Sequence, residues 1–334
     1  TLEVQSIFAT LRPQQVALIQ AIGAQPQVDD SFLKQSFADQ KQWNFGVHVI
    51  EKFGIRWERS RQDRAAHPFT TTFGQNDVRI TTRVHDNMPG SALFSSMHEA
   101  GHALYELGFD PSHRRTPLSD AASLAVHESQ SRMWENLVGR SYNFWSHFYP
   151  LFQQTFDAQL NNVDLAQFYK AINKVEPSLV RVEADEATYN LHVMVRLEIE
   201  IALLEGSILV KDLPELWNTK MQDFLGLTPA NDSNGVLQDV HWSAGLFGYF
   251  PTYALGNLIS VQLWDKMHLD MPNLDEEIRM GKFNTMLEWL RVNIHRHGAK
   301  YEAQQMVQKV AGSKIDPQPY MRYLTKKYSE IYGI

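Results

Sequence analysis

From residue 91 to the C-terminus, apolar residues recur at the spacing of amphipathic α-helices in one segment after another. We expect helices at Ser91–Leu107, Asp120–Val138, Asn143–Phe156, Asp164–Val175, Ala184–Leu204, Pro214–Leu225, Phe250–Met267, Leu274–His295, Tyr301–Val310 and Tyr320–Tyr332. Leu2–Ile22 has the same spacing, with Pro13 as an expected kink or break. Leu227–Val240, rich in Asn, Asp, Ser and Gly, is expected to be a loop. This pattern predicts a mainly α fold.

The apolar period changes clearly in one place, between residues 67 and 84. Thr70, Thr71 and Thr72 are β-branched, the segment from Gly74 to Asp77 has turn chemistry, and apolar and polar residues then alternate up to Thr81. We therefore expect a small β-hairpin or sheet here. With no repeat, low-complexity tract or charge block, residues 1–334 are expected to form a single domain.

Composition excludes several classes of function. The chain has 31 Lys and Arg against 38 Asp and Glu, a net charge of -7, which disfavours binding to nucleic acid or an anionic membrane. It has no cysteine, so disulfide scaffolds, cysteine catalysis and thiolate metal sites are excluded, and a cytoplasmic location is favoured. The most apolar stretch, Leu191–Val210, carries four charged residues and cannot span a membrane. The first residues show no signal-peptide pattern.

One short motif carries chemistry: His98-Glu99-Ala100-Gly101-His102, inside a predicted helix. Residues four apart project from the same face of a helix, so both histidines can bind one ion. Glu99 lies on the adjacent flank, where it can meet a water on the metal. The alternative is a pair of surface histidines, but the band that they border is largely apolar, and buried histidines need partners. The spacing favours a metal site.

A catalytic zinc requires a third protein ligand, and cysteine is excluded here. Glu106 follows His102 by four residues but lies a helical turn too far from His98. Glu128 follows His102 by 26 residues, after a turn that lets a second helix pack on the first. We expect Glu128 to be the third ligand. The alternative is a salt bridge from Glu128 to Arg132, four residues further on.

Six elements in order support a wider resemblance: His67-Pro68-Phe69, Asp77-Val78-Arg79-Ile80-Thr81, the His98–His102 motif, His127-Glu128-Ser129-Gln130, Arg181-Val182-Glu183-Ala184-Asp185-Glu186 and Gly235-Val236-Leu237-Gln238-Asp239-Val240-His241-Trp242. On these elements the chain resembles the carboxypeptidase Taq family, thermostable metallocarboxypeptidases with a HExxH motif. The resemblance implies a helical cleft like those of neurolysin and angiotensin-converting enzyme. Family chains are longer, and we expect the missing part to be an N-terminal helical region.

The resemblance also implies an activity. It predicts a homodimeric, zinc-dependent carboxypeptidase of broad specificity, with cobalt as an alternative metal, which releases single C-terminal amino acids from peptides. By resemblance His98, His102 and Glu128 bind the metal, and Glu99 is the general base. The enzyme-class alternative is an oligoendopeptidase or dipeptidyl carboxypeptidase in the same fold. The non-enzyme alternative is an inactive metal-binding fragment.

Two further roles have more than one candidate. The free carboxylate of a substrate needs a cation, for which Arg79 and Arg181 are the candidates. A local ion network with the acidic residues after it is the alternative for Arg181. The oxyanion needs donors, and His241 with Tyr249, or else Tyr253, are the candidates by resemblance. Their aromatic surroundings could instead be core. For orienting the zinc histidines the candidates are Asp120 and a backbone carbonyl, and the sequence does not decide between them.

Overall fold

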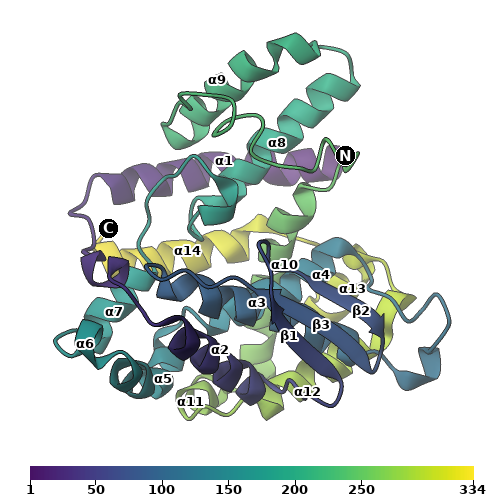
Figure 1. The fold of residues 1–334 in the computed structure, drawn as a ribbon. Coiled ribbons are helices and arrows are strands. Elements are labelled where there is room, and N and C mark those ends of the chain that lie inside the picture. Colours follow the sequence, from purple (N-terminus) through teal and green to yellow (C-terminus); the bar gives the residue numbers. More distant parts are fainter. The chain divides into compact units, whose positions relative to one another are not determined.

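The computed structural model describes residues 1–334, which are mainly helical with one small sheet, as predicted (Figure 1). Contacts divide the chain into two compact units, each made of segments that are distant in sequence. Unit 1 comprises Thr1–Gln27, Asn173–Leu255 and Asp316–Ile334, and unit 2 comprises Val28–Ile172 and Gly256–Ile315. That both units act as one catalytic domain stays a prediction.

Unit 2 holds the sheet and most of the helices. Its elements are η1 (Ser31–Lys34), α2 (Asp39–Phe53), β1 (Ser60–Arg64), β2 (Thr70–Gly74), β3 (Asp77–Thr82), α3 (Pro89–Leu107), η2 (Pro111–His113), α4 (Leu124–Arg132), the π-helical turn η3 (Met133–Val138), α5 (Tyr142–Thr155), α6 (Asp157–Leu160), α7 (Leu165–Ile172), α11 (Leu274–Arg279), α12 (Asn284–Asn293), η6 (His295–Lys300) and α13 (Ala303–Ala311). The long helix α10 (Pro251–Asp270) crosses from unit 1 into unit 2.

The sheet confirms the predicted hairpin and adds a strand. β2 and β3 pair antiparallel around the turn from Gly74 to Asp77, while β1 pairs with β3 in parallel, giving the order β1-β3-β2. β1 was not predicted, because its sequence Ser-Arg-Gln-Asp-Arg is polar and shows no apolar alternation. Val78 and Ile80 of β3 are buried, and α3 packs beside β3 and β2 (Figure 1).

Close contact between α3 and α4 is made at a glycine. A Cβ atom on Gly101 would lie 2.6 Å from the Cα atom of Ser131 and 2.7 Å from the carbonyl oxygen of Gln130. Any larger residue at this position would push the two helices apart. The same applies to Gly256 of α10, whose Cβ would lie 2.5 Å from the Cβ of Glu128. These two glycines hold three helices around one group of polar side chains.

Unit 1 is a smaller helical group. Its elements are α1 (Leu2–Gly23), η4 (Arg181–Glu183), α8 (Tyr189–Leu204), η5 (Val210–Asp212), α9 (Leu213–Leu225), the start of α10 and α14 (Pro317–Tyr332). α1 packs against α8 and α14, and α9 packs against α8. Residues 227–240 form turns and bends without a helix or strand, as predicted.

Three predicted helices differ from those observed, each for a local reason. The helix expected at Leu274–His295 is instead α11 and α12, because Gly281 adopts φ 68° between them. α8 begins at Tyr189 and not at Ala184, because the Asp185 carboxylate accepts the backbone N–H groups of Ala187 and Thr188. α4 begins at Leu124 because the Ser123 side chain caps it. α1 continues through Pro13, so of the expected kink or break the break is absent.

No helix combines the length and the apolar character that crossing a bilayer requires. The Leu191–Val210 stretch belongs to α8 and the segment after it. Arg196 and Glu200 of α8 are buried, and both are bonded to polar partners within unit 1. Residues 191–200 of this stretch are therefore mostly buried in a helical unit, whereas Leu204, Leu209 and Val210 are exposed.

Candidate metal centre

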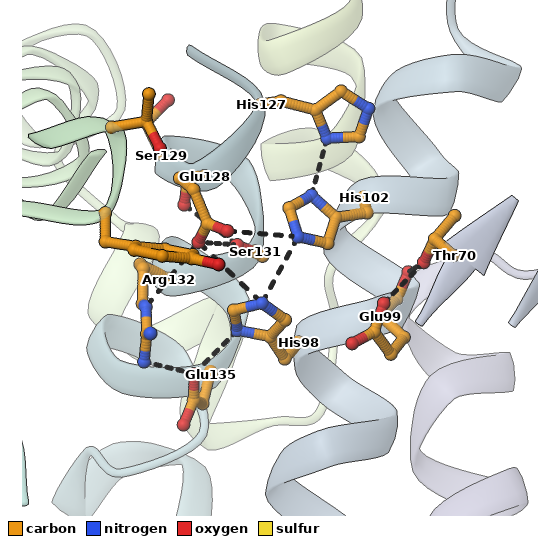
Figure 2. A network of polar contacts seen from close by, with 12 residues as sticks. Thr70, His98, Glu99, His102, His127, Glu128, Ser129, Ser131, Arg132 and Glu135 are labelled. Atoms are coloured by element: carbon orange, nitrogen blue, oxygen red, sulfur yellow. Dashed lines mark hydrogen bonds and ion pairs between the residues drawn. The ribbon is translucent and has the colours of Figure 1, made fainter. Parts of the chain in front are cut away.

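Two helices of unit 2 bring three potential ligands together, as the sequence predicted. α3 supplies His98 and His102, and α4 supplies Glu128. One ligand atom from each residue lies within 4.8 Å of the others. Figure 2 shows both imidazole rings turned toward the Glu128 carboxylate from neighbouring helices. We call these three residues the metal centre.

The geometry of the metal centre fits a tetrahedral ion. The Nε2 atoms of the two histidines are 3.2 Å apart, and each lies 3.7 Å from a Glu128 carboxylate oxygen. Bonds of about 2.0–2.1 Å to zinc would place tetrahedral ligand atoms about 3.3 Å apart. The three side chains are between 9% and 17% exposed, which leaves access for a further ligand. Two imidazoles and a carboxylate are a donor set that suits zinc.

His98 is oriented by a carboxylate that the sequence analysis did not identify. Its Nδ1–H donates to Oε2 of Glu135 over 2.9 Å, which directs Nε2 to the metal centre (Figure 2). Burial alone would raise the pKa of Glu135, but Arg132, His98 and Arg140 lower it to about 2. Glu135 is therefore an anion at neutral pH and a fixed acceptor.

His102 is oriented by a second histidine. The Nδ1 atoms of His102 and His127 lie 2.5 Å apart, and Nε2 of His127 contacts a carboxylate oxygen of Glu106 at 2.9 Å. The expectation that Asp120 or a backbone carbonyl orients the zinc histidines is thus wrong for both rings. Burial and the neighbouring His127 and His98 lower the pKa of His102 well below its ordinary value. A neutral ring is the form that binds a metal.

Glu99 lies beside the ligand set and has its own partner. The hydroxyl of Thr70, on β2, donates to Oε2 of Glu99 over 2.6 Å (Figure 2). Burial raises the pKa of Glu99, and the charges of Glu128 and Glu135 act in the same direction. A carboxylate with a raised pKa next to a metal centre is a stronger proton acceptor than an exposed one. No pattern in the sequence points to Thr70 as its partner.

Glu128 has polar partners in addition to the histidines. The Ser131 hydroxyl donates to its Oε2 over 3.2 Å, and Nε of Arg132 lies 3.7 Å from the same oxygen. The salt bridge to Arg132, offered as an alternative to metal binding, thus coexists with the ligand geometry. Nη1 of Arg132 also lies 3.1 Å from Oε2 of Glu135. Arg132 therefore holds both carboxylates in place.

The arginine candidate in unit 1 is held by a distant aspartate. Arg181 donates from Nε and Nη2 to Oδ1 of Asp239 over 3.1 and 2.7 Å, and Arg196 donates from Nε to Oδ2 over 2.6 Å. Nη1 of Arg181 donates to the Tyr189 hydroxyl over 2.8 Å. The predicted alternative, a network with Glu183, Asp185 and Glu186, does not form. We call Arg181, Arg196 and Asp239 the arginine cluster.

The arginine cluster carries an excess positive charge. Burial alone would raise the pKa of Asp239, but Arg196 and Arg181 hold it below its usual value. Burial lowers the pKa of Arg196 to about 10, so this guanidinium is still charged at neutral pH. Two cations thus face one anion in unit 1. Such a group suits an additional anion, for example a carboxylate.

The oxyanion candidates lie next to the arginine cluster in unit 1. Nε2 of His241 lies 3.1 Å from the Tyr253 hydroxyl, and the ring packs against Phe250 and Tyr249. Burial and the charge of Arg181 lower the pKa of His241 to about 4, so the ring is neutral at pH 7. Tyr249 precedes α10, whereas Tyr253 lies within it, as expected. His241 thus packs among aromatic rings, as the alternative predicted, and also has a polar contact through Nε2.

Arg79 contacts neighbours on the sheet. Its Nε and Nη2 atoms donate to the two oxygens of Asp77 over 2.9 and 2.8 Å, and its guanidinium lies 4.6 Å from the centre of the Phe73 ring. The side chain is 46% exposed. Its role in binding substrate stays a prediction.

Comparisons with known proteins identify the family of this chain. The profile of the carboxypeptidase Taq (M32) metallopeptidase family matches residues 1–328. Thermostable carboxypeptidase 1 of Thermus thermophilus is 45% identical over 332 residues, which are 99% of this chain and 65% of that protein. Carboxypeptidase 1 of Bacillus subtilis is 40% identical over 327 residues, which are 98% of this chain and 65% of that protein.

Solved structures give the same result for the fold. The M32 carboxypeptidase of Deinococcus radiodurans matches with a TM-score of 0.98 and 42% identity, covering 100% of this chain and 67% of that chain. Metallocarboxypeptidase 1 of Trypanosoma cruzi matches with a TM-score of 0.92 and 32% identity, covering 98% of this chain and 69% of that chain.

The chain spans 65% of the length of the two curated relatives. That the remaining part is an N-terminal helical region stays a prediction. The match nevertheless extends over nearly every residue of the chain, including the metal centre and the arginine cluster. The chain therefore belongs to the carboxypeptidase Taq family of metallopeptidases.

Proposed function

We propose that this chain contains the catalytic machinery of a zinc-dependent metallocarboxypeptidase that releases single C-terminal amino acids from peptides. The observation that carries the proposal is the arrangement of four side chains in unit 2. His98, His102 and Glu128 converge with atoms spaced for one ion, while Glu99 is held apart by Thr70. Ligands and base are thus separate groups, as peptide hydrolysis by a metal-activated water requires.

Zinc at this site would lower the pKa of a water to about 7 and polarise the scissile carbonyl. Glu99 would take a proton from the attacking water and deliver it to the leaving amine. Burial raises the pKa of Glu99, which makes its carboxylate a stronger base toward the water. Thr70 would fix Oε2 of Glu99 and leave Oε1 directed to the water. Cobalt suits the same donors as an alternative metal.

Residues of unit 1, and Arg79 of unit 2, are proposed to bind the substrate. The excess positive charge of the arginine cluster supports Arg181 as the partner of the substrate's free carboxylate, with Arg79 as the second candidate. His241 and Tyr249 are proposed as oxyanion donors, and Tyr253, which contacts Nε2 of His241, as a substrate-binding residue. A neutral His241 would donate a hydrogen bond to a developing negative charge.

The cellular setting of the activity is proposed from composition and resemblance. The absence of cysteine supports a cytoplasmic location. The net charge of -7 disfavours nucleic acid and anionic membranes as partners, and the resemblance supports peptides with a free C-terminus. The resemblance supports a homodimer. Sedimentation of the purified protein tests the last of these: a species of twice the chain mass is expected, and a monomer at micromolar concentration would contradict it.

A release assay combined with metal analysis tests the proposed function. Purified protein, loaded with zinc, is incubated with a peptide that has a free C-terminal carboxylate and with the same peptide as a C-terminal amide. We expect stepwise loss of single residues from the free peptide and no cleavage of the amide. Cleavage of the amide would indicate an oligoendopeptidase, and release of dipeptides a dipeptidyl carboxypeptidase. Full zinc content without turnover of either peptide would contradict the activity.

A further inference from the structure

We propose that His127, supported by Glu106, is a positioning residue that fixes His102 in the tautomer and orientation needed to bind the metal. The inference rests on the proposed metal centre. It assigns a role to the first residue of the His127-Glu128-Ser129-Gln130 element, whose glutamate is a ligand and whose histidine has had no function so far. It also assigns one to Glu106, which the spacing excludes as a ligand.

The contacts form a continuous chain across two helices. Oε1 of Glu106 lies 2.9 Å from Nε2 of His127, and Nδ1 of His127 lies 2.5 Å from Nδ1 of His102. In Figure 2 the His127 ring lies on the side of His102 that faces away from Glu128. Nε2 of His102 then points to the other ligands. Each helix thus supplies a ligand and a support: His102 and Glu106 on α3, Glu128 and His127 on α4.

The hydrogen-bonding capacity of these groups fixes the direction of each bond. An ionised carboxylate only accepts, so Nε2 of His127 carries the hydrogen. In a neutral ring Nδ1 of His127 is then an acceptor, and Nδ1 of His102 must be the donor. Nε2 of His102 is left without a hydrogen, and its lone pair is free to bind a metal ion. Without Glu106, His127 could take the opposite tautomer and reverse this order.

Packing keeps the His127 ring in place. Its centre lies 4.5 Å from the centre of the His102 ring and 5.2 Å from that of Tyr105, which meets it edge-on. The hydroxyl of Tyr105 in turn accepts the backbone N–H of Ala122, just before α4. His127 is only 17% exposed and Glu106 13%. A ring held on both edges and on its face is suited to orient a ligand.

His127 is not a fourth ligand in this geometry. Both of its nitrogens are engaged, one with Glu106 and one with the outer nitrogen of His102. Three residues, His98, His102 and Glu128, present atoms to a common point, and His127 is not among them. The two zinc histidines therefore have different supports: a carboxylate held by arginines for His98, and an imidazole backed by a carboxylate for His102.

The test is the dissociation constant for zinc, measured by competition with a chelator in the absence of substrate. His127→Leu removes the acceptor and should raise the dissociation constant about 10- to 100-fold. His127→Asn places an amide oxygen close to the position of Nδ1 and should restore most of the affinity. Glu106→Leu should weaken binding in the same direction as His127→Leu. His48→Leu, at a half-buried histidine that packs on Phe148 in the same unit, is the matched control and should bind as the wild type does.

Three outcomes would overturn the proposal. They are an unchanged dissociation constant in His127→Leu, an equal loss in His127→Leu and His127→Asn, and unchanged binding in Glu106→Leu. The second would mean that the ring matters for packing alone. Because no peptide is present, the result does not depend on catalysis. Failure of the proposed function would instead appear as absence of peptide release with this affinity pattern intact.

Discussion

The metal centre of unit 2 and the arginine cluster of unit 1 are both buried polar groups, but they are assembled in different ways. The metal centre comes from two helices that follow each other in the chain, with an i, i+4 pair on the first. The arginine cluster joins Asp239 to residues 58 and 43 positions earlier. The first group is anionic around an ion site, and the second is cationic.

This difference indicates what each group does in the protein. In the metal centre a bound cation would balance the charge of the Glu128 carboxylate. Substitution of a ligand should therefore affect metal binding more than folding. The arginine cluster is a buried ion network in which two arginines share one counter-ion, Asp239. Breaking one of its members leaves charges unpaired, so its loss should affect stability at least as much as substrate binding. The two groups should therefore respond differently to substitution.

The largest effect is expected at the third ligand. Glu128→Ala should reduce the zinc content from about one ion per chain to nearly none, because three protein ligands are needed to hold a catalytic zinc. The measurement is elemental analysis after dialysis. Glu276→Ala, at an exposed glutamate paired with Arg279, is the control and should keep its zinc. Full zinc in the Glu128 variant would remove this residue from the metal centre.

The next effect concerns folding of unit 1. Asp239→Asn should destabilise the protein by about 3–5 kcal/mol, since Arg181 and Arg196 would lose their shared buried counter-ion. Denaturant unfolding followed by circular dichroism measures it. Asp77→Asn breaks an Asp–Arg pair of the same type at the surface and should leave stability unchanged. Equal stability of the two variants would show that burial of the cluster does not matter.

Acid should reduce the difference in stability between the wild type and Asp239→Asn. Arg196 and Arg181 hold the pKa of Asp239 below 3.8, so the folded state keeps the carboxylate charged while the unfolded state protonates first. Its contribution is complete above pH 3.8 and is lost as the pH falls through the lowered value. We therefore expect the stability gap between wild type and Asp239→Asn to narrow below that pH. A gap that widens on acidification would contradict the assignment.

The smallest effect is expected at the support of the base. Thr70→Val keeps the side-chain volume but removes the donor to Glu99, and should lower kcat roughly fivefold, about 1 kcal/mol, with zinc content unchanged. Thr70→Ser retains a hydroxyl and should recover most of the rate. If Thr70→Val and Thr70→Ser lower kcat equally, the methyl group of Thr70 and not its hydrogen bond determines the rate.

The sequence predicted the parts of the site that depend on local spacing. His98 and His102 share a helical face because four residues make about one turn, and Glu128 follows after a single turn of chain. Glu135 could have been found in the same way, since it lies seven residues after Glu128 on nearly the same face. That spacing holds for a regular α-helix, whereas Glu135 lies inside the π-helical turn Met133–Val138, which the residues do not predict.

The parts that could not be predicted depend on pairing across long separations. Nothing local to Arg181 indicates Asp239, and the acidic residues beside it suggested the wrong partners. The polar strand β1 exists because β3 offers a free edge, and not because of its own pattern. His127 was visible in its motif, but its contact with His102 follows from the close approach of α3 and α4 at Gly101.

The central claim is that Glu99 acts on the substrate side of the metal centre without binding the ion. Glu99→Gln tests it most directly, because glutamine preserves the shape of the side chain and removes its capacity to take up a proton. Zinc content and kcat are measured on the same preparation. We expect unchanged zinc content and a kcat lower by about 10²- to 10⁴-fold. Loss of zinc, or retention of kcat, would contradict it.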